Sequence, residues 1–312
     1  MADIVITESL EPSALALLEQ DFTVHCDPEL WNKRAELERL VRQLTALIVR
    51  NRTRVDKALL GLAPRLKVVG RLGVGLDNID VNHCEARGIE IVSARGANAT
   101  SVAEYAIAMA MTLLRGPAYL GTQRLLNGEW PREAFGRGLE LAGKTLGVIG
   151  LGSIGSTTAR KARALEMRVI ACDPYLPPAS ENWHLAEMVS LDTLLGTADV
   201  VTLHCPLTEE TRGMISAQEI GRMKKGSVLI NSARGGIVDH PALAAALKSG
   251  DVGGAALDVF AWEPIKKEEA EIFDGVANVI LTPHIAGVTA EASHRVSHMT
   301  VEGVARILKK RR

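Results

Sequence analysis

The chain has 312 residues, of which 47% are hydrophobic, and this is enough to bury the cores of two domains. Its formal net charge of −1 leaves no overall positive field, so we expect neither nucleic acid nor a membrane surface as a partner. No basic leader precedes an apolar segment and no apolar run is long enough to span a bilayer, which predicts a soluble protein of the cytoplasm.

The cysteines argue against both a metal site and a disulfide framework. They are scattered without any CxxC pair, at Cys26, Cys84, Cys172 and Cys205. Free thiols are typical of a reducing compartment, and we expect no bound metal.

The first hundred residues alternate short apolar runs with amphipathic segments. The apolar runs are DIVIT (3–7), FTVHC (22–26), ALIVR (46–50), LKVVG (66–70) and IEIVS (89–93). This alternation of strands and helices predicts a doubly wound α/β unit, with a mostly parallel sheet covered on both faces.

A long helical pattern follows at 101–115, SVAEYAIAMAMTLLR, and is apolar on most sides. Beyond Gly116-Pro117 it continues as an amphipathic segment, AYLGTQRLLNG (118–128). A helix of this composition requires burial against a neighbouring domain or against another subunit.

The alternation of strands and helices then starts again. Its apolar runs are TLGVIG (145–150), RVIACD (168–173), DVVTLHCP (199–206), SVLINSA (227–233), AALDVF (255–260) and NVILTP (278–283). We therefore predict a second doubly wound unit, followed by one closing helix over 289–310.

Two glycine-rich loops compete as the dinucleotide site, GRLGVG (70–75) and GLGSIG (150–155). The second loop ends a strand and opens a helix, whose free N–H groups and positive dipole end suit a pyrophosphate. The next strand ends in Asp173, where a carboxylate can bind an adenosine ribose and would repel a 2′-phosphate. This loop therefore predicts NAD as the cofactor.

The first loop lacks both the long helix and the acidic residue. Two interpretations remain open: its glycines let the backbone around Val74 and Gly75 approach a small substrate anion, or they form a plain structural turn.

Three motifs of the second unit carry candidate chemistry: NSARGG (231–236), WEP (262–264) and TPHIAG (282–287). Arg234 offers a planar fork for a carboxylate, and histidines such as His284 exchange protons near neutral pH. Glu263 could orient His284 and stabilise it when protonated. Each residue alone also has a structural interpretation, but together behind a dinucleotide loop they indicate an active site.

In these motifs the sequence resembles the NAD-dependent D-isomer-specific 2-hydroxyacid dehydrogenases. The matching stretches are GLGSIG with Asp173, LHCPLT, INSARGGIVD, AALDVF, WEP and TPHIAG, in the family's order over nearly the full chain. The resemblance implies a Rossmann NAD-binding domain (98–287) inserted into a flavodoxin-like substrate domain (1–97 with 288–312). It also implies a homodimer joined through the central helical segment.

The resemblance implies that Arg234 binds the substrate carboxylate, that His284 is the acid and base at the C2 hydroxyl, and that Glu263 is the partner of His284. It further implies a set of residues that line the cofactor: Gly150, Gly152, Ser153, Ile154, Gly155, Asp173, Cys205, Pro206, Thr211, Ala233, Asp258 and Gly287.

Arg50 and Arg71 match arginine positions of phosphoglycerate dehydrogenases, and both end strands of the first unit. Because Arg234 already serves the carboxylate, these arginines predict a second anion on a three-carbon, D-configured 2-hydroxy acid. Both 3-phosphoglycerate and 3-sulfolactate meet that description. Arg52 and Arg54 are expected to be solvated on the following turn.

Two alternatives remain open. A glyoxylate or hydroxypyruvate reductase would need no second anion site. A corepressor-like protein that senses NAD(H) could share the fold and the three active-site residues, because function resides in sites rather than in folds.

Overall fold

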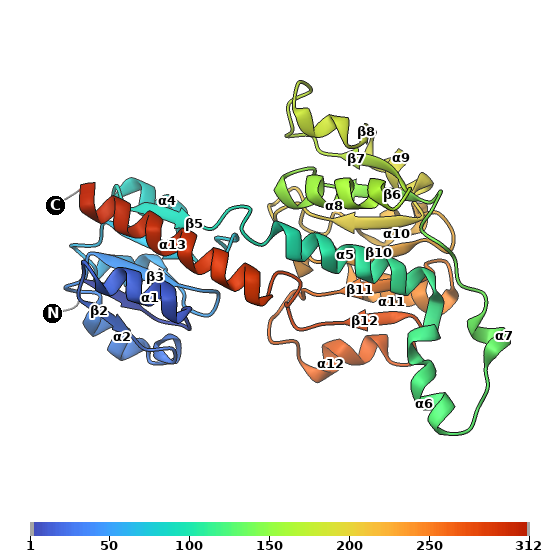
Figure 1. Cartoon of the computed structure of the whole chain (residues 1–312), viewed down its shortest axis with the longest axis horizontal. Coiled ribbons are helices and arrows are strands. Elements are labelled where there is room, and N and C mark those ends of the chain that lie inside the picture. Colours follow the sequence, from blue (N-terminus) through green and yellow to red (C-terminus); the bar gives the residue numbers. More distant parts are fainter. Residues whose placement is uncertain (1–2, 311–312) are drawn as a thin grey trace. The chain divides into compact units, whose positions relative to one another are not determined.

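The computed structural model describes residues 3–310, which form two α/β units (Figure 1). The first unit runs up to Asn98 and resumes at Val288, and the second is Ala99–Gly287. The second unit is therefore inserted into the chain of the first. Among the described residues, none of the helices combines the length and apolar composition that crossing a bilayer requires.

The first unit is built on a five-stranded parallel sheet. The strand order is β2-β1-β3-β4-β5, which is the flavodoxin-like order expected from the sequence. The strands are β1 (Ile4–Ile6), β2 (Val24–Cys26), β3 (Ala46–Val49), β4 (Val68–Arg71) and β5 (Glu90–Ser93).

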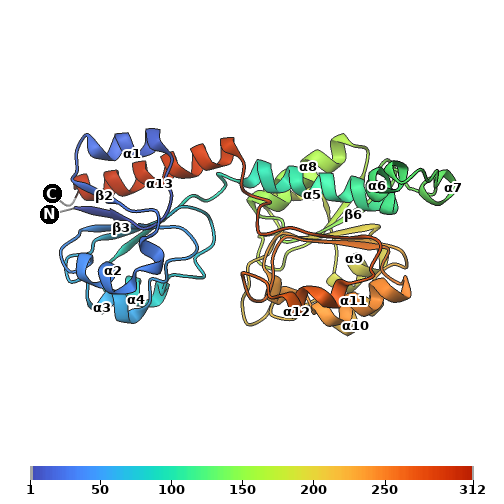
Figure 2. The same cartoon turned by 90° about the horizontal axis from the view of Figure 1, so that it is seen from below.

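Helices cover both faces of this sheet, as Figure 2 shows: α1 (Pro12–Glu19) and α13 (Ala290–Lys310) lie on one face, and α2 (Arg34–Leu40), α3 (Lys57–Gly61) and α4 (Val81–Ala86) lie on the other. Alternate strand residues therefore enter different cores. Ile4 and Ile6 join the core under α1 and α13, whereas Val5 joins the opposite core. This burial on both faces explains the continuous apolar runs in the sequence.

The closing helix α13 packs closely on the sheet because two glycines make room for it. A Cβ on Gly70 of β4 would lie 2.8 Å from Val304, and one on Gly303 of α13 would lie 2.5 Å from Val92. These distances are too short for real side chains, so a larger residue at either position would force the helix away from the sheet.

The second unit contains a seven-stranded parallel sheet in the order β12-β11-β10-β9-β6-β7-β8. Reversal of the order between β6 and β9 is the Rossmann arrangement, so the predicted fold class is confirmed. The strands are β6 (Thr145–Ile149), β7 (Arg168–Cys172), β8 (Glu187–Met188), β9 (Val200–Leu203), β10 (Val228–Asn231), β11 (Gly254–Leu257) and β12 (Val279–Leu281).

On one face of this sheet lie α5 (Ala99–Leu114) and α8 (Ser153–Ala164). The other face carries α9 (Leu191–Thr197), α10 (Ala217–Arg222), α11 (His240–Ser249) and α12 (Lys267–Ala270). Two short helices, α6 (Gly121–Leu126) and α7 (Arg132–Phe135), follow α5. The 3-10 turns are η1 (Leu30–Asn32), η2 (Gly116–Leu120), η3 (Glu181–His184), η4 (Gly235–Ile237) and η5 (Glu271–Phe273).

The second amphipathic segment expected at 118–128 is helical over most of its length. It forms the end of a 3-10 turn and then the short helix α6. Gly116 adopts a left-handed φ of +68° and ends the regular hydrogen bonding of α5. The predicted closing helix is confirmed over Ala290–Lys310.

Candidate active site

The candidate site lies at one edge of the seven-stranded sheet. All its strands run parallel, so the loops that leave their carboxyl ends gather along a single edge, the usual ligand-binding edge of open α/β sheets. The loops after β6, β7, β9, β10, β11 and β12 begin with or contain Gly150, Asp173, Cys205, Arg234, Asp258 and His284, respectively.

Of the three glycines after β6, two are required sterically and one leaves open space. Gly150 has a φ of +90°, and a Cβ there would lie 2.9 Å from the backbone nitrogen of Cys205. A Cβ on Gly155 would lie 2.0 Å from the carbonyl oxygen of Gly150, which only glycine permits. Gly152 has open space around its missing side chain: apart from its two chain neighbours, no residue within 3–310 has an atom within 4 Å of a Cβ built there.

This loop fits the pyrophosphate of a dinucleotide. Gly152 is the N-cap of α8, and no side chain of the described residues caps that helix end. The N–H groups of the first turn, including those of Ser153 and Ile154, therefore meet open space beside Gly152 and can donate to an anion.

The acidic residue expected beside the ribose is tied to the same loop. One Asp173 oxygen accepts a hydrogen bond of 2.8 Å from the amide of Leu151, between the first two glycines. Its other oxygen accepts from the amides of Tyr175 and Leu176, each at 3.1 Å. The carboxylate is half-buried and retains lone pairs for hydroxyl groups.

The loop after β9 begins with two side chains that are neutral near neutral pH. Burial raises the pKa of the Cys205 thiol to about 11 and lowers the pKa of the adjacent His204 to about 4, so both are uncharged near neutral pH. The Thr211 hydroxyl donates to the carbonyl of Pro206 over 2.7 Å, which closes the loop on itself. Ala233, after β10, is buried, and Gly287 is half-buried.

His284 and Glu263 are brought together across 21 residues of sequence. Nδ1 of His284 lies 2.6 Å from Oε2 of Glu263, and Oε1 of Glu263 accepts a 3.0 Å hydrogen bond from the amide of Phe260. Burial alone would raise the pKa of Glu263. The hydrogen bond and charge of His284, the amide of Phe260 and the charge of Arg234 outweigh it, so the pKa lies below its ordinary value of 4.5.

A charged Glu263 has a direct consequence for its partner. It holds the Nδ1 side of the imidazole, so Nε2 is the nitrogen left to exchange a proton. The His284 side chain is 42% exposed, which leaves it accessible.

The backbone of His284 is held in an uncommon conformation. Its φ is +57°, a left-handed value that non-glycine residues rarely adopt. The His284 amide donates to the carbonyls of Asp258 and Thr282, at 2.8 and 3.0 Å. Strain of this kind persists where the surroundings fix the backbone, and it is common at functional sites.

Asp258 supplies most of that fixation. Its carboxylate is buried and accepts three hydrogen bonds from the turn after β12: 2.6 Å from the Thr282 hydroxyl and 2.8 Å from each of the amides of Ile285 and Ala286. The Thr282 hydroxyl lies 2.7 Å from the hydroxyl of Tyr105. Burial raises the pKa of Tyr105 to about 12, so this phenol keeps its proton and can donate it to Thr282.

Sequence reasoning did not single out Thr282 or Tyr105. Thr282 lies inside the TPHIAG motif and could have been found there. Tyr105 lies on α5, 177 residues earlier in the chain, and nothing in its local sequence points to the β12 turn.

Arg234 lies in the loop after β10, which packs on the segment that carries Glu263. A Cβ on Gly235 would lie 2.0 Å from the backbone carbon of Phe260, so only glycine allows this approach. The Asn231 side-chain amide donates to the Arg234 carbonyl over 3.0 Å, and the Arg234 guanidinium donates to the Ala233 carbonyl over 2.6 Å. Backbone and guanidinium are thus both anchored.

In the first unit, Arg50 and Arg71 end neighbouring strands. Val49 of β3 pairs with Arg71 of β4, and Arg50 is the next residue after β3. A Cβ on Gly73 would lie 2.0 Å from Nη1 of Arg71, so this glycine makes room for the guanidinium. The half-buried residues Val74 and Gly75 follow in the same loop.

The residue that organises this edge, Glu8, was missed by sequence reasoning. It follows β1 and is 5% exposed, and its carboxylate accepts from the amides of Arg50, Arg52 and Thr53 at 2.8, 3.2 and 3.1 Å. The Thr53 hydroxyl donates to it over 2.9 Å. A glutamate two residues after a buried strand was the available signal.

The buried carboxylate of Glu8 therefore holds one side of the turn after β3. Asn78 closes its other side by donating to the carbonyls of Arg50 and Thr53, at 3.0 and 2.6 Å. Arg52 and Arg54 are exposed, and the guanidinium of Arg52 lies 4.7 Å from the ring centre of Trp31.

Comparison with known proteins identifies the family. Residues 107–286 match the model of the D-isomer specific 2-hydroxyacid dehydrogenase NAD-binding domain. The chain is 49% identical, over 99% of both chains, to an (S)-sulfolactate dehydrogenase of Chromohalobacter salexigens. It is 39% identical over 99% of its length to a D-3-phosphoglycerate dehydrogenase of Methanocaldococcus jannaschii, of which it spans 58%.

Among solved structures, a D-lactate dehydrogenase of Aquifex aeolicus, complexed with NAD and lactic acid, superposes with a TM-score of 0.81. The two sequences are 30% identical, and the match covers 98% of this chain and 96% of the other. Together with the glycine loop, Asp173 and the His284–Glu263 pair, these matches show that the chain belongs to the NAD-binding D-isomer specific 2-hydroxyacid dehydrogenases.

Proposed function

We propose that this enzyme interconverts (S)-3-sulfolactate and its 2-keto acid with NAD. The observation that carries the substrate assignment is the pair of arginines, Arg50 and Arg71, at the ends of two neighbouring strands of the first unit. Two guanidinium groups suit an anion that carries three oxygens. The 49% identity with a sulfolactate dehydrogenase favours sulfonate over phosphate.

The stereochemistry is compatible with this assignment. A sulfonate at C3 outranks the carboxylate at C2, whereas a phosphate ester at C3 does not. The sulfolactate with the same spatial arrangement as a D-configured hydroxy acid is therefore named S. One site geometry can serve (S)-3-sulfolactate and D-3-phosphoglycerate, and the anion at C3 decides between them.

In the proposed mechanism, Arg234 binds the substrate carboxylate through its planar fork and orients C2. During oxidation, Nε2 of His284 takes the proton of the C2 hydroxyl, and Glu263 stabilises the imidazolium that forms. During reduction, the protonated His284 returns that proton to the carbonyl oxygen. NAD, which the glycine loop and Asp173 would hold, would supply the hydride acceptor for oxidation at C2 and the hydride donor for reduction.

Asp258 acts in this proposal as a positioning residue. Its carboxylate is buried and bonded to the turn that bears His284. By fixing the amides of Ile285 and Ala286, it keeps His284 in its left-handed conformation. We assign the remaining cofactor contacts to the glycine loop, to Asp173 and to the loop after β9.

The test is the rate of NADH formation with a panel of acids: both enantiomers of 3-sulfolactate, 3-phosphoglycerate, D-glycerate, D-lactate and D-malate. We expect the highest kcat/KM for (S)-3-sulfolactate and no turnover of its enantiomer. A preference for phosphoglycerate would overturn the sulfonate assignment. Tight NADH binding without turnover of any acid, or of hydroxypyruvate in reverse, would favour a sensor.

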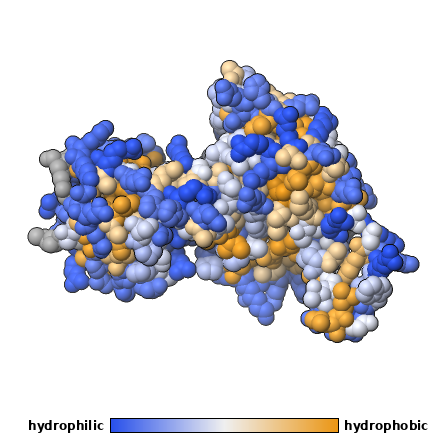
Figure 3. Space-filling view, in the orientation of Figure 1, coloured by the Kyte–Doolittle hydropathy of each residue, from blue (hydrophilic) through white to orange (hydrophobic). Residues whose placement is uncertain are grey.

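We also propose that the enzyme is a homodimer joined through the segment after α5. Apolar side chains are exposed there: Leu126 is 76% exposed and Trp130 79%, and Figure 3 shows hydrophobic surface over α6. A contiguous apolar patch of this kind marks an interaction site, and a second copy of the chain is the occupant we propose. Light scattering should give twice the chain mass, and Trp130→Asp should reduce it.

We assign the enzyme to the cytoplasm. Its four cysteines are free thiols, and burial raises the pKa of three that lie in or next to strands, Cys26, Cys172 and Cys205. Unpaired thiols are typical of a reducing compartment. Fractionation of cells that produce the protein tests this assignment.

A further inference from the structure

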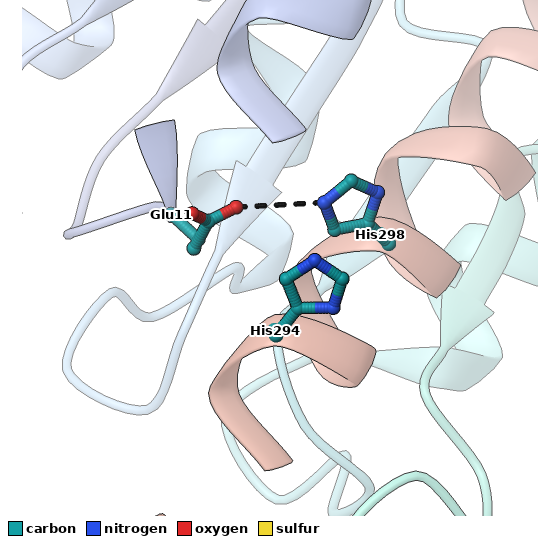
Figure 4. A group of neighbouring side chains, drawn as sticks. All are labelled: Glu11, His294 and His298. Carbon is teal, nitrogen blue, oxygen red and sulfur yellow. Dashed lines mark ion pairs between the residues drawn. The ribbon is translucent and has the colours of Figure 1, made fainter. Parts of the chain in front are cut away.

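A cluster of two histidines and a glutamate joins α1 to α13 within the first unit. Figure 4 shows His294 and His298 projecting from α13 and Glu11 facing them from the start of α1. The histidines are four residues apart, so they lie on the same face of the helix one turn apart. None of these three residues belongs to the catalytic machinery described above.

The spacing of the cluster suits a metal ion. One ligand atom from each residue lies within 4.8 Å of the others, and Nε2 of His298 is 3.4 Å from a carboxylate oxygen of Glu11. Two ligands at about 2.0–2.1 Å from a tetrahedral zinc ion are about 3.3 Å apart. The Glu11–His298 pair therefore already has the separation that a shared ion requires.

The two imidazole rings are arranged in a way that leaves nitrogen atoms for a ligand. They stack with their centres 4.1 Å apart and their planes 23° from parallel. Within residues 3–310, the His294 ring stacks on His298 and makes no hydrogen bond. Two imidazoles and one carboxylate are the donor set of many zinc sites, in which water takes the fourth position.

Ser13 is the competing partner. Its hydroxyl lies 2.7 Å from Nε2 of His298 and also donates to the Glu11 carboxylate. Without a metal, these hydrogen bonds connect the two helices. Because the hydroxyl proton of Ser13 goes to Glu11, Nε2 of His298 donates to the serine oxygen. With a metal, this nitrogen must lose its proton and its hydrogen bond to Ser13, so that its lone pair can bind the ion.

We propose that Glu11, His294 and His298 bind a divalent transition-metal ion, with zinc as the best match to this nitrogen and oxygen donor set. The ion acts as a clamp between the N-terminus of α1 and the helix α13, which are about 280 residues apart in the chain. The other end of the same helix pair is already joined by an ion pair of 2.5 Å between Asp21 and Lys309. Metal binding therefore stabilises the first unit without contributing to catalysis.

The first experiment is calorimetric titration of the metal-free protein with zinc chloride. We expect one ion per chain, and binding at least about tenfold weaker in His294→Ala and in His298→Ala, because loss of a direct ligand costs more than loss of an outer partner. His83→Ala, which removes a half-buried histidine of α4 in the same unit, is the matched control and should bind like the native chain.

The second readout separates a metal site from a hydrogen-bonded helix contact. Zinc at about a hundred times its Kd should raise the melting temperature of the native chain by roughly 5–10 °C and leave that of His298→Ala unchanged. Ser13→Ala should retain this zinc effect, because it removes only the competing hydroxyl. The electron paramagnetic resonance spectrum of bound Cu²⁺ should report two nitrogen ligands.

Two outcomes would overturn the proposal. One is the absence of stoichiometric binding to the native chain at millimolar zinc. The other is binding that persists in both α13 variants and is lost in His284→Ala, since the ion would then occupy the catalytic histidine. Dehydrogenase activity is not a readout of this test, because the proposed ion does not contribute to catalysis.

Discussion

The carboxyl edges of the two sheets use the same structural device. In the five-stranded sheet, Glu8 follows β1 and its buried carboxylate binds the turn after the neighbouring strand β3. In the seven-stranded sheet, Asp258 follows β11 and binds the turn after the neighbouring strand β12. Each acid accepts hydrogen bonds from backbone N–H groups of the turn that it holds, and so satisfies donors that the strand ladders do not pair.

The two turns differ in what they hold. The Asp258 turn fixes His284 in a left-handed conformation, and Glu263 fixes its ring. At Arg50, the hydrogen bonds of the Glu8 turn hold the backbone N–H and C=O groups and do not involve the guanidinium. This difference follows from the proposed tasks: proton transfer requires one nitrogen at one position, whereas a long cationic side chain can reach an anion from several rotamers.

We expect the largest effect from removing His284, the proton-transferring residue on the Asp258 turn. His284→Ala should lower kcat by about 10²- to 10⁴-fold, because no other group takes the hydroxyl proton. NADH affinity, measured by fluorescence titration, should remain nearly unchanged. His83→Ala is the matched control, and near-normal turnover by His284→Ala would contradict the assigned role.

Loss of the recognition arginine should act on KM rather than on kcat. Arg50→Gln should raise KM for (S)-3-sulfolactate about 10- to 100-fold, the magnitude of one charge-assisted contact, and leave KM for D-lactate nearly unchanged. Arg54→Gln, an exposed neighbour, is the matched control. Equal effects of Arg50→Gln on both acids would refute the second anion site.

Variants of the two buried acids, Asp258 and Glu8, should affect different kinetic parameters. Together they test most directly whether the two turns have different tasks. Asp258→Asn should lower kcat about tenfold, because it loosens the turn that bears His284. Glu8→Gln should raise KM for the doubly anionic acid about tenfold with little change in kcat. Both should lower the unfolding free energy by about 1–3 kcal/mol, since each presents an amide to buried donors.

If both buried-acid variants changed the same parameter, the division of tasks between the two edges would be wrong. Steady-state kinetics with (S)-3-sulfolactate and with D-lactate distinguishes these outcomes. Urea unfolding of each variant gives the loss of stability separately.

The smallest expected effect is a shift in pH dependence. Glu263→Gln removes the carboxylate that is hydrogen-bonded to His284, and with it a group whose pKa lies below its ordinary value of 4.5. Because the pKa of Glu263 is lower in the folded than in the unfolded chain, its charge stabilises the fold above pH 4.5, and this contribution is lost as pH falls through the lowered pKa.

The variant should therefore show a smaller loss of unfolding free energy than the native chain as the pH falls below 4.5. Urea unfolding of both chains across the acid range tests this prediction. An equal loss of unfolding free energy in the variant and in the native chain would mean that the partners of Glu263 do not stabilise its charged form.

Much of the candidate site was accessible from local sequence. The glycine loop, Asp173 and the motifs around Arg234, Glu263 and His284 each follow a recognisable strand, and carboxyl ends of parallel strands must share an edge. The fold class and the NAD cofactor predicted on these grounds are confirmed by the strand order and by the family match. The individual roles of the residues and the choice of acid remain predictions.

Other features were out of reach because their partners are distant in sequence. Tyr105 contacts Thr282 across 177 residues, and Ser13 contacts His298 across 285. Neither tyrosine nor serine belongs to a motif, and no local pattern says which helix face meets which loop. Glu8 was visible as an acid after a strand, but its partners were not.

The sequence by itself determined the two parallel sheets, the dinucleotide loop and the residue types at the strand ends, because each depends on local periodicity and on chain order. Only the tertiary structure decided which carboxylate holds which turn, that His284 is held left-handed, and that two histidines of the closing helix meet Glu11. These contacts depend on which strands and helices become neighbours, and that neighbourhood exists only after the sheets have assembled.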